Sequence, residues 1–361
     1  MLIGCSSPTL QKAPVADRDQ APVATPAPAR QFAGPTKSRW VSVDWDTLPG
    51  FNDDSLYEAW VAWVRSCERP AEPFIKLCVD VRRLSIADAA TQRAWMLNRL
   101  QPHRVESQQG DAQGLLTGYF EPALNASRLP TAAYKFPLYQ IPINLGKRKP
   151  WFTRQEAQTV PEAKEALNNR VIAYLESPVD VQVLQIQGSG QLRFTQDNGS
   201  VRQVRLAYAG SNDHTYRSIG KWLLERGLVR DASWAGIKAW LAQNPQREQE
   251  LLGVNPRLVF FRELPESDQD ALGGPVGAQG VVLTAGRSIA VDAGSIPYGA
   301  PVWLSSQGAA GTFNKLVLAQ DTGHAISGAV RADYFVGSGP VAGDSAGRIR
   351  QALQMWVLWP K

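Results

Sequence analysis

Histidine, cysteine and methionine are scarce in this sequence, with three of each among 361 residues. The histidines, His103, His214 and His324, stand far apart, which argues against a His-rich metal site. No run approaches the ~18–20 apolar residues of a membrane-spanning helix, so the sequence excludes a polytopic membrane protein. A large excess of one charge is also missing, since 38 Lys and Arg stand against 33 Asp and Glu. The resulting net charge of +5 suits an anionic polymer, a membrane surface or simple solubility, whereas nucleic acid usually demands a denser basic face.

The composition that remains is globular, with 44% hydrophobic and 20% charged residues, which excludes a wholly disordered chain. The length predicts roughly two domains. Tryptophan is frequent, with 12 Trp against 9 Tyr and 11 Phe. We expect most of these Trp in the core, while any on loops would suit stacking against sugar rings.

The sequence has an odd number of cysteines, so they cannot all pair within one chain. Cys67 and Cys78 can form a disulfide in an oxidising compartment or remain two buried thiols, and the sequence leaves both open. Cys5 lies in the segment Leu-Ile-Gly-Cys-Ser-Ser, which resembles the bacterial lipobox, where the cysteine is lipidated. The basic segment and longer apolar stretch of a complete signal do not precede it. Ser6 after the cysteine resembles outer-membrane sorting in Gram-negative bacteria.

Residues 8–36 are rich in Pro and Ala and predict a semi-extended tether. Beyond it, helical spacing and turn signals predict a body with helices first and short strands later. The expected helices are 56–67, 86–100, 216–226 and 233–242, and the expected strands are 112–122, 181–187, 191–195, 201–207, 258–261, 281–283, 288–291, 302–304, 316–319 and 355–359. The spacing of the last six strands is typical of a barrel.

Two polar segments are candidates for ligand contact. Gln187-Gly188-Ser189-Gly190 ends a predicted strand, and its glycines let a ligand approach the backbone, although taken alone the segment fits an ordinary hairpin turn better. The second segment, 208–216, is polar with a Tyr at each end and precedes a predicted helix, so it also fits a capped loop.

Three aspartates, Asp292, Asp321 and Asp333, adjoin apolar runs and Gly-rich turns. Carboxylates at the mouths of barrel strands suit acid–base chemistry on a sugar, and a capping Asp in a turn is the alternative. Asp321-Thr322-Gly323 also matches the aspartic-protease motif, but such a single-chain enzyme needs two copies and the sequence has one.

Five segments together resemble the family of membrane-bound lytic murein transglycosylase A (MltA). They are Thr117–Pro122, Gln185–Gly190, Tyr208–Gly210 with Tyr216 and Ser218–Gly220, Asn255-Pro256, and the segment with the three aspartates. They occur in the family's order from about residue 50 to the C-terminus. His324 and Ala332 depart from the family's pattern, and neither replaces a carboxylate.

The resemblance implies a mainly β fold with peripheral helices. A double-psi β-barrel would comprise residues 40–121 and 257–361, with a smaller β domain inserted over 122–256 and a substrate groove between the two. Residues 1–39 would hold the lipobox and the tether.

The resemblance also implies an activity, cleavage of the β-1,4 bond between N-acetylmuramic acid and N-acetylglucosamine in peptidoglycan. The family cleaves without water and leaves a 1,6-anhydromuramoyl end. Asp333 would be the single acid and base, with Asp321 and Asp292 in support. The implied substrate contacts are Thr117, Tyr119, Gln187, Gly188, Ser189 and Tyr208.

No cofactor or metal is expected, because the spacing of the aspartates matches no calcium-loop motif. The implied partners are peptidoglycan strands, a lipid anchor at Cys5 and complexes with other cell-wall enzymes, for a monomer in the periplasm held at the outer membrane. A competing interpretation is an expansin-like module that binds peptidoglycan without cleaving it, but the presence of all three aspartates favours an enzyme.

Overall fold

The computed structural model describes residues 34–264 and 273–361. Cys5, its lipobox and most of the expected tether lie outside these ranges. Among the described residues, no helix is long and apolar enough to cross a membrane.

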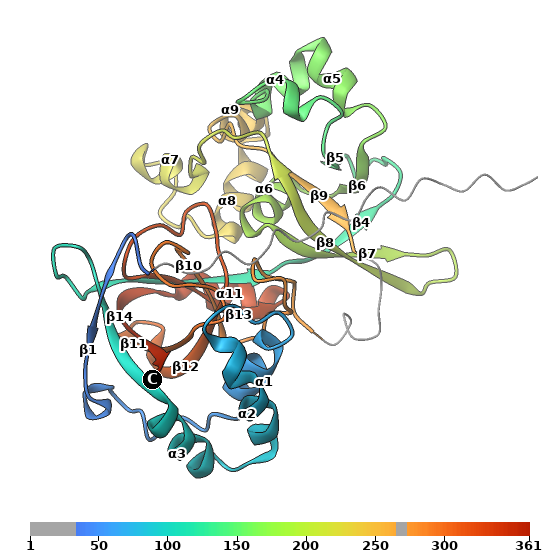
Figure 1. Ribbon diagram of the computed structural model, residues 1–361. Helices are drawn as coiled ribbons and strands as arrows, with labels where there is room; N and C mark the ends of the chain where they lie inside the picture. Colours follow the sequence, from blue (N-terminus) through green and yellow to red (C-terminus); the bar gives the residue numbers. More distant parts are fainter. Residues whose placement is uncertain (1–33, 265–272) are drawn as a thin grey trace, which may run out of the picture. The chain divides into compact units, whose positions relative to one another are not determined.

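The larger sheet has eight strands in the order β1-β2-β14-β11-β12-β10-β13-β3 (Figure 1). Since β14 also pairs with β3, the six strands from β14 round to β3 close into a barrel. Two pairs, β10 with β12 and β13 with β3, are parallel, and the others are antiparallel. The strands are β1 Arg39–Ser42, β2 Leu100–Glu106, β3 Gly114–Glu121, β10 Ser288–Val291, β11 Pro301–Gly308, β12 Gly311–Asp321, β13 Arg331–Ser338 and β14 Arg350–Pro360. Closure leaves no free edge within these six strands.

Apolar side chains from both halves of the chain fill the barrel. Strand β10 is buried along its whole length, as its sequence Ser-Ile-Ala-Val allows. Trp303, Leu318 and Val357 contribute to the same core from neighbouring strands and are fully buried. The segment 281–283, expected as a strand, makes only the isolated bridge between Val276 and Val282.

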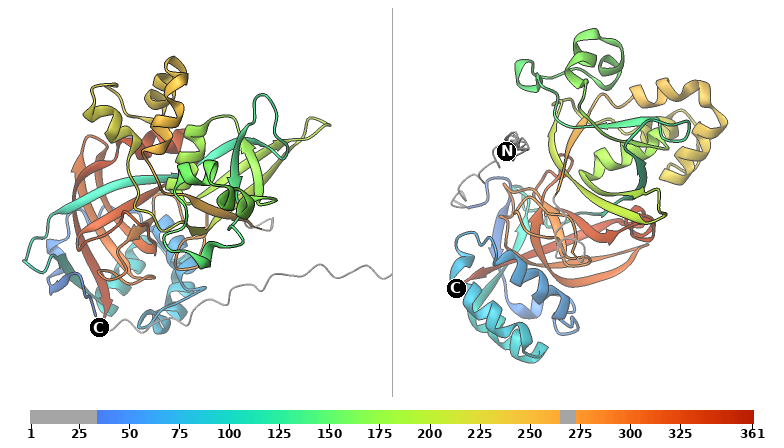
Figure 2. Two further views of the ribbon diagram at one scale, coloured as in Figure 1. Left: turned by 90° about the horizontal axis from the view of Figure 1, so that it is seen from above. Right: turned by 90° about the vertical axis from the view of Figure 1, so that its right-hand side faces the viewer.

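Three helices cover the barrel near the start of the described chain, namely α1 Tyr57–Ser66, α2 Cys78–Arg83 and α3 Ala89–Arg99 (Figure 2). Trp60 and Trp63 of α1 pack their rings against Trp95 of α3. Cys67 and Cys78 form a disulfide, which settles the alternative that the sequence left open. Another helix, α11 Pro340–Arg348, packs against β3 and β13.

The second sheet has six strands in the order β5-β6-β4-β7-β8-β9. They are β4 Ala123–Ser127, β5 Phe136–Tyr139, β6 Val171–Leu175, β7 Ser189–Thr195, β8 Val201–Ser211 and β9 Val259–Glu263. Its helices are α4 Arg154–Thr159, α5 Pro161–Leu167, α6 Pro178–Gln187, α7 Ile219–Glu225, α8 Trp234–Gln243 and α9 Glu248–Gly253. The short 3-10 helices among the described residues are η1 Trp45–Thr47, η2 Phe74–Leu77, η3 Leu84–Ile86, η4 Leu145–Lys147 and η5 Pro245–Arg247. Because β9 pairs with β8, the chain leaves this sheet after Glu263 and not at residue 257 as expected.

The expected strand at 181–187 is wrong, because this segment belongs to helix α6. The side chain of Ser177 caps the backbone N–H of Val179, Pro178 takes the first helical turn, and Gly188 ends the helix with a φ of 79°. The β-branched valines suggest a strand, but the helix buries Val179 and Val183 in one cluster and Leu184 in another. Tertiary burial therefore overrides local propensity. The closed barrel with a second sheet confirms the mainly β fold class.

Candidate active site

Strand register brings two of the three aspartates to neighbouring positions on the barrel. Ala290 of β10 is the register partner of Asp333 on β13 and of Asp321 on β12. On its other side, Asp333 is paired with Thr117 of β3. Residues from both ends of the barrel sequence therefore meet here.

Asp333 is held by a relay of polar side chains. The Thr117 hydroxyl donates a 2.5 Å hydrogen bond to Oδ1 of Asp333. Arg331 in turn donates from Nη2 to the Thr117 Oγ1 over 2.8 Å, and its Nη1 donates to the carbonyl oxygens of Leu115 and Ala332. Burial raises the pKa of Asp333, although the Thr117 hydrogen bond and the charge of Arg331 oppose the rise. This carboxyl is therefore suited to carry a proton.

Asp321 is the second carboxyl with a raised pKa. Tyr119 donates from its phenol to Oδ2 over 2.9 Å, and the backbone N–H of Ala278 donates to Oδ1 over 3.0 Å. Burial raises the pKa of Asp321 to about 6, and the charge of Asp333 adds to this, against the hydrogen bonds that it accepts. Burial and the two carboxylates also raise the pKa of Tyr119, which keeps its phenol protonated as a donor.

Asp292 has a different environment and a different charge state. Lys37 donates to its Oδ2 over 2.9 Å, and the backbone N–H groups of Gly294 and Gly328 donate to Oδ1 and Oδ2. Burial alone would raise its pKa, but these donors lower the pKa below its usual value. Asp292 therefore stays ionised and joins the turn after β10 to the segment before β13.

The candidates from the second sheet divide into two groups. The side-chain oxygen of Gln187 accepts a 3.2 Å hydrogen bond from the backbone N–H of Phe120, which places Gln187 against β3 beside Tyr119. Gly188 ends α6, Ser189 begins β7, and Tyr208 lies half exposed on β8. Among the described residues, Gly188, Ser189 and Tyr208 make no hydrogen bond to the three aspartates.

Sequence reasoning gave no role to Arg331 or Glu121, and both are central to the geometry. Glu121 is fully buried and accepts hydrogen bonds from Arg205 (2.7 Å), Gln191 (2.8 Å) and Ser338 (2.7 Å). It thereby ties β3 to the second sheet and to β13. A carboxylate at the end of an apolar strand was the available signal, because a buried charge needs partners.

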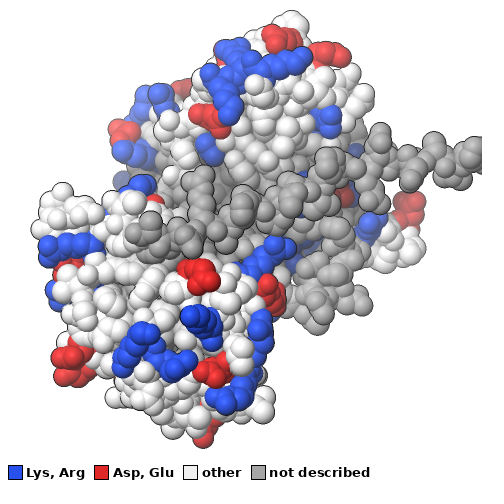
Figure 3. All heavy atoms as spheres, in the orientation of Figure 1, with Lys and Arg blue, Asp and Glu red and all other residues white. Residues whose placement is uncertain are grey.

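No group of three or more His, Cys, Asp or Glu is arranged to hold a metal ion within 34–264 and 273–361. On the face drawn in Figure 3, basic side chains form separate groups with acidic ones between them. This face lacks the continuous basic stripe typical of nucleic-acid binding.

Comparison with known proteins gives a consistent set of relatives. The family model of the MltA specific insert domain matches residues 115–262, and that of the 3D domain matches residues 287–359. The chain is 34% identical over 262 residues to the membrane-bound lytic murein transglycosylase A of Vibrio cholerae, which covers 69% of this chain and 67% of that protein. The Escherichia coli K12 protein of the same name is 34% identical over 255 residues, covering 67% of this chain and 64% of that protein. These matches span about two thirds of each relative.

Solved structures agree with these relatives. The lytic transglycosylase LtgG of Burkholderia pseudomallei is 40% identical with a TM-score of 0.64, covering 91% of this chain and 97% of that chain. MltA from Neisseria gonorrhoeae is 28% identical with a TM-score of 0.75, covering 93% and 96%. MltA from E. coli with bound chitohexaose is 25% identical with a TM-score of 0.71, covering 92% and 96%.

Proposed function

This chain belongs to the family of membrane-bound lytic murein transglycosylase A, and on that premise we propose that it cleaves the bond between N-acetylmuramic acid and N-acetylglucosamine without water. The product would carry a 1,6-anhydromuramoyl end. The observation that carries the proposal is the pair of neighbouring carboxyls, Asp333 and Asp321, whose pKa values are both raised. The chitohexaose bound to E. coli MltA supports a β-1,4-linked amino-sugar substrate.

In the proposed mechanism, Asp333 acts first as acid and then as base. Its protonated carboxyl gives a proton to the glycosidic oxygen as the bond from C1 to that oxygen breaks. The C6 hydroxyl of the same muramoyl residue then attacks C1 and returns its proton to the carboxylate. One carboxyl suffices because the nucleophile belongs to the substrate, and intramolecular attack has a high effective molarity. Hydrolysis would need a second carboxylate as nucleophile or base.

The contacts of Asp333 suit this sequence of steps. The Thr117 hydroxyl donates to Oδ1 of Asp333, and no described residue hydrogen-bonds to Oδ2 of Asp333. Oδ2 is therefore left for the substrate. After proton donation, the charge of Arg331 favours the carboxylate through Thr117. Burial favours a protonated Asp333 at the start, and Asp292 fixes the adjoining turn.

Muropeptide analysis by mass spectrometry tests the activity directly. Sacculi digested with the full chain should release fragments with 1,6-anhydro ends. Reducing ends would show hydrolysis instead. Intact sacculi with bound protein would favour the expansin-like alternative.

We also propose that Cys5 carries a lipid anchor, as its lipobox and the names of the membrane-bound relatives suggest. In cell fractionation, the protein should partition to membranes, and Cys5→Ser should release it. If the variant stays as membrane-bound as the wild type, lipidation at Cys5 is the wrong account.

A further inference from the structure

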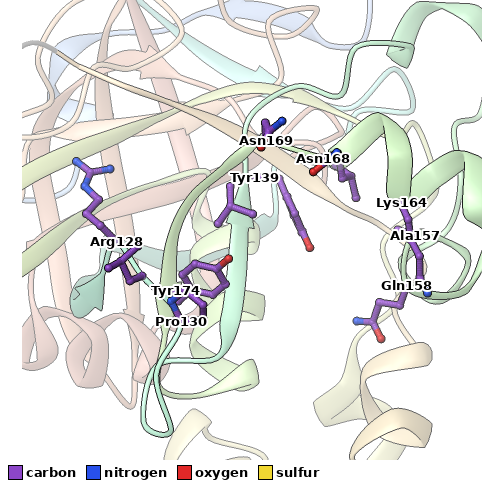
Figure 4. A pocket seen from close by; sticks show the side chains of 12 residues that line it. Arg128, Pro130, Tyr139, Ala157, Gln158, Lys164, Asn168, Asn169 and Tyr174 are labelled. Atoms are coloured by element: carbon purple, nitrogen blue, oxygen red, sulfur yellow. The ribbon is translucent and has the colours of Figure 1, made fainter.

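The second sheet carries a cavity of about 700 Å³ outside the aspartate site (Figure 4). Three segments line it: the chain after β4, strands β5 and β6, and helices α4 and α5 with the residues that follow. None of the lining residues belongs to β3, β10, β12 or β13, which carry the candidate catalytic groups. Its volume lies in the usual range for small-ligand sites.

Two tyrosines line this cavity from the neighbouring strands β5 and β6. Tyr139 of β5 and Tyr174 of β6 are both partly buried and lie near enough for Tyr174 to influence the titration of Tyr139. Burial, and then Tyr174, raise the pKa of Tyr139 to about 12, so the phenol stays neutral and can donate a hydrogen bond. Flat rings with a polar tip suit a ligand that has both apolar C–H faces and hydroxyl groups.

The rim of the cavity carries polar side chains that make no hydrogen bond or ion pair within the described part of the protein. Gln158, Asn168, Asn169 and Lys164 are exposed around the cavity, and no hydrogen bond or ion pair of their side chains occurs in the described part of the protein. Each amide offers donors and an acceptor, the pattern that sugar hydroxyl and acetamido groups require.

The charge of the cavity narrows the ligand class. Arg128 is paired through both terminal nitrogens with Glu263, so its charge is already balanced. Lys164 therefore remains as the cation without a described partner among the lining residues. Three amides and two phenols against one such cation favour a neutral or weakly anionic ligand over a polyanion.

We propose that this cavity is a second glycan-binding site, which takes an N-acetylated amino-sugar segment away from the cleavage site. The inference rests on the proposed function, since a peptidoglycan strand is long enough to be held at a second point. Such a site would hold the polymer without taking part in the chemistry.

Isothermal titration of the full chain with chitohexaose tests the proposal. In an Asp333→Asn background, which suppresses cleavage, the oligosaccharide should bind at two sites. Adding Tyr174→Ala should weaken one of them by at least about tenfold and leave the other unchanged. The double variant Gln158→Ala with Asn168→Ala, both at exposed positions, should weaken the same site and guards against a folding defect of Tyr174→Ala. Tyr57→Ala, at a tyrosine that is 71% exposed on α1, is the matched control and should retain both sites.

A single site that is unaffected by Tyr174→Ala and by the double variant overturns the second site. If free stem peptides bind at this cavity and chitohexaose does not, the cavity is a peptide-binding site and the glycan proposal is also overturned. Failure of the proposed function would be seen in a different experiment, the muropeptide analysis, as the absence of anhydro ends from digests with the wild-type protein.

Discussion

The hydroxyl of Thr117 donates a 2.5 Å hydrogen bond to Asp333, although 216 residues separate the two in sequence. Strand β3, which carries Thr117, comes before the second sheet in the chain, and β13, which carries Asp333, comes after it. Their parallel pairing is part of the closed barrel and brings Thr117 beside Asp333. The hydrogen bond therefore makes the candidate acid depend on both ends of the barrel sequence.

Replacing Thr117 with valine removes this donor while keeping the shape of the side chain. Because the Thr117 hydrogen bond lowers the pKa of Asp333, the pKa should rise in Thr117→Val. The protonated form should persist to higher pH, so the falling limb of the pH–rate profile should move upward. Loss of positioning should also lower kcat by up to ~10²-fold. Thr117→Ser keeps the hydroxyl and should restore the wild-type profile, and an unmoved limb in Thr117→Val would show that the contact is merely structural.

Asp333→Asn tests the acid itself. The amide keeps the size of the side chain but cannot give a proton to the leaving oxygen. Release of anhydro-muropeptides should fall by ~10²–10⁴-fold, the usual contribution of a general acid. Binding to sacculi and the melting temperature should stay near those of the wild type. Near-normal release would remove Asp333 from the mechanism and make Asp321 the next candidate.

Sequence patterns singled out the three aspartates as candidates and predicted β10, β11, β12 and β14, because both are local signals, but β13, which carries Asp333, was not among the expected strands. Asp292, Asp321 and Asp333 each adjoin an apolar run and a glycine-rich turn, and such runs mark strand ends. The pairing of β3 with β13 is not local, and the resemblance to a family implied only that both ends of the body share one barrel.

Other parts of the site could not be read from the sequence. Arg331 acts through Thr117, a residue 214 positions away, so no spacing pattern reveals it. The valines of α6 favoured a strand, and only burial on two faces of the helix explains the outcome. Glu121 gave the signal of a charge beside an apolar run, but its partners Arg205 and Gln191 belong to a different sheet.

The disulfide between Cys67 and Cys78 should stabilise the helices that cover the barrel. The double variant Cys67→Ser with Cys78→Ser removes the disulfide, which closes a loop between residues 11 positions apart in the sequence. The free energy of unfolding should fall by about 2–4 kcal/mol, measured by denaturant titration. Lytic activity below the melting temperature should be unchanged, because the described hydrogen bonds of the three aspartates involve neither cysteine. Equal stability of the oxidised and reduced wild type would contradict this expectation.

Asp321 should make stability depend on pH in the direction opposite to an ordinary ion-paired carboxylate. Its pKa is about 6 in the folded protein, against 3.8 for an unperturbed group, so the folded state binds the proton more tightly than the unfolded state. Stability is therefore greatest while both states are protonated, and it is lost as pH rises from about 4 to about 6. Asp321→Asn cannot ionise and removes this loss. Relative to the wild type, the free energy of unfolding of the variant should rise on the order of 1–3 kcal/mol between pH 4 and pH 7.

Urea titrations at several pH values measure this difference. Asp53→Asn, at an exposed position on the same body, is the control and should follow the wild-type curve. The amide introduced by Asp321→Asn retains one oxygen that can accept from Tyr119, but its NH2 group cannot accept from the backbone N–H of Ala278. The lost hydrogen bond shifts the stability by a constant amount, so the charge is read from the change with pH. Parallel curves for Asp321→Asn and the wild type would show that Asp321 ionises as readily in the folded protein as in the unfolded chain.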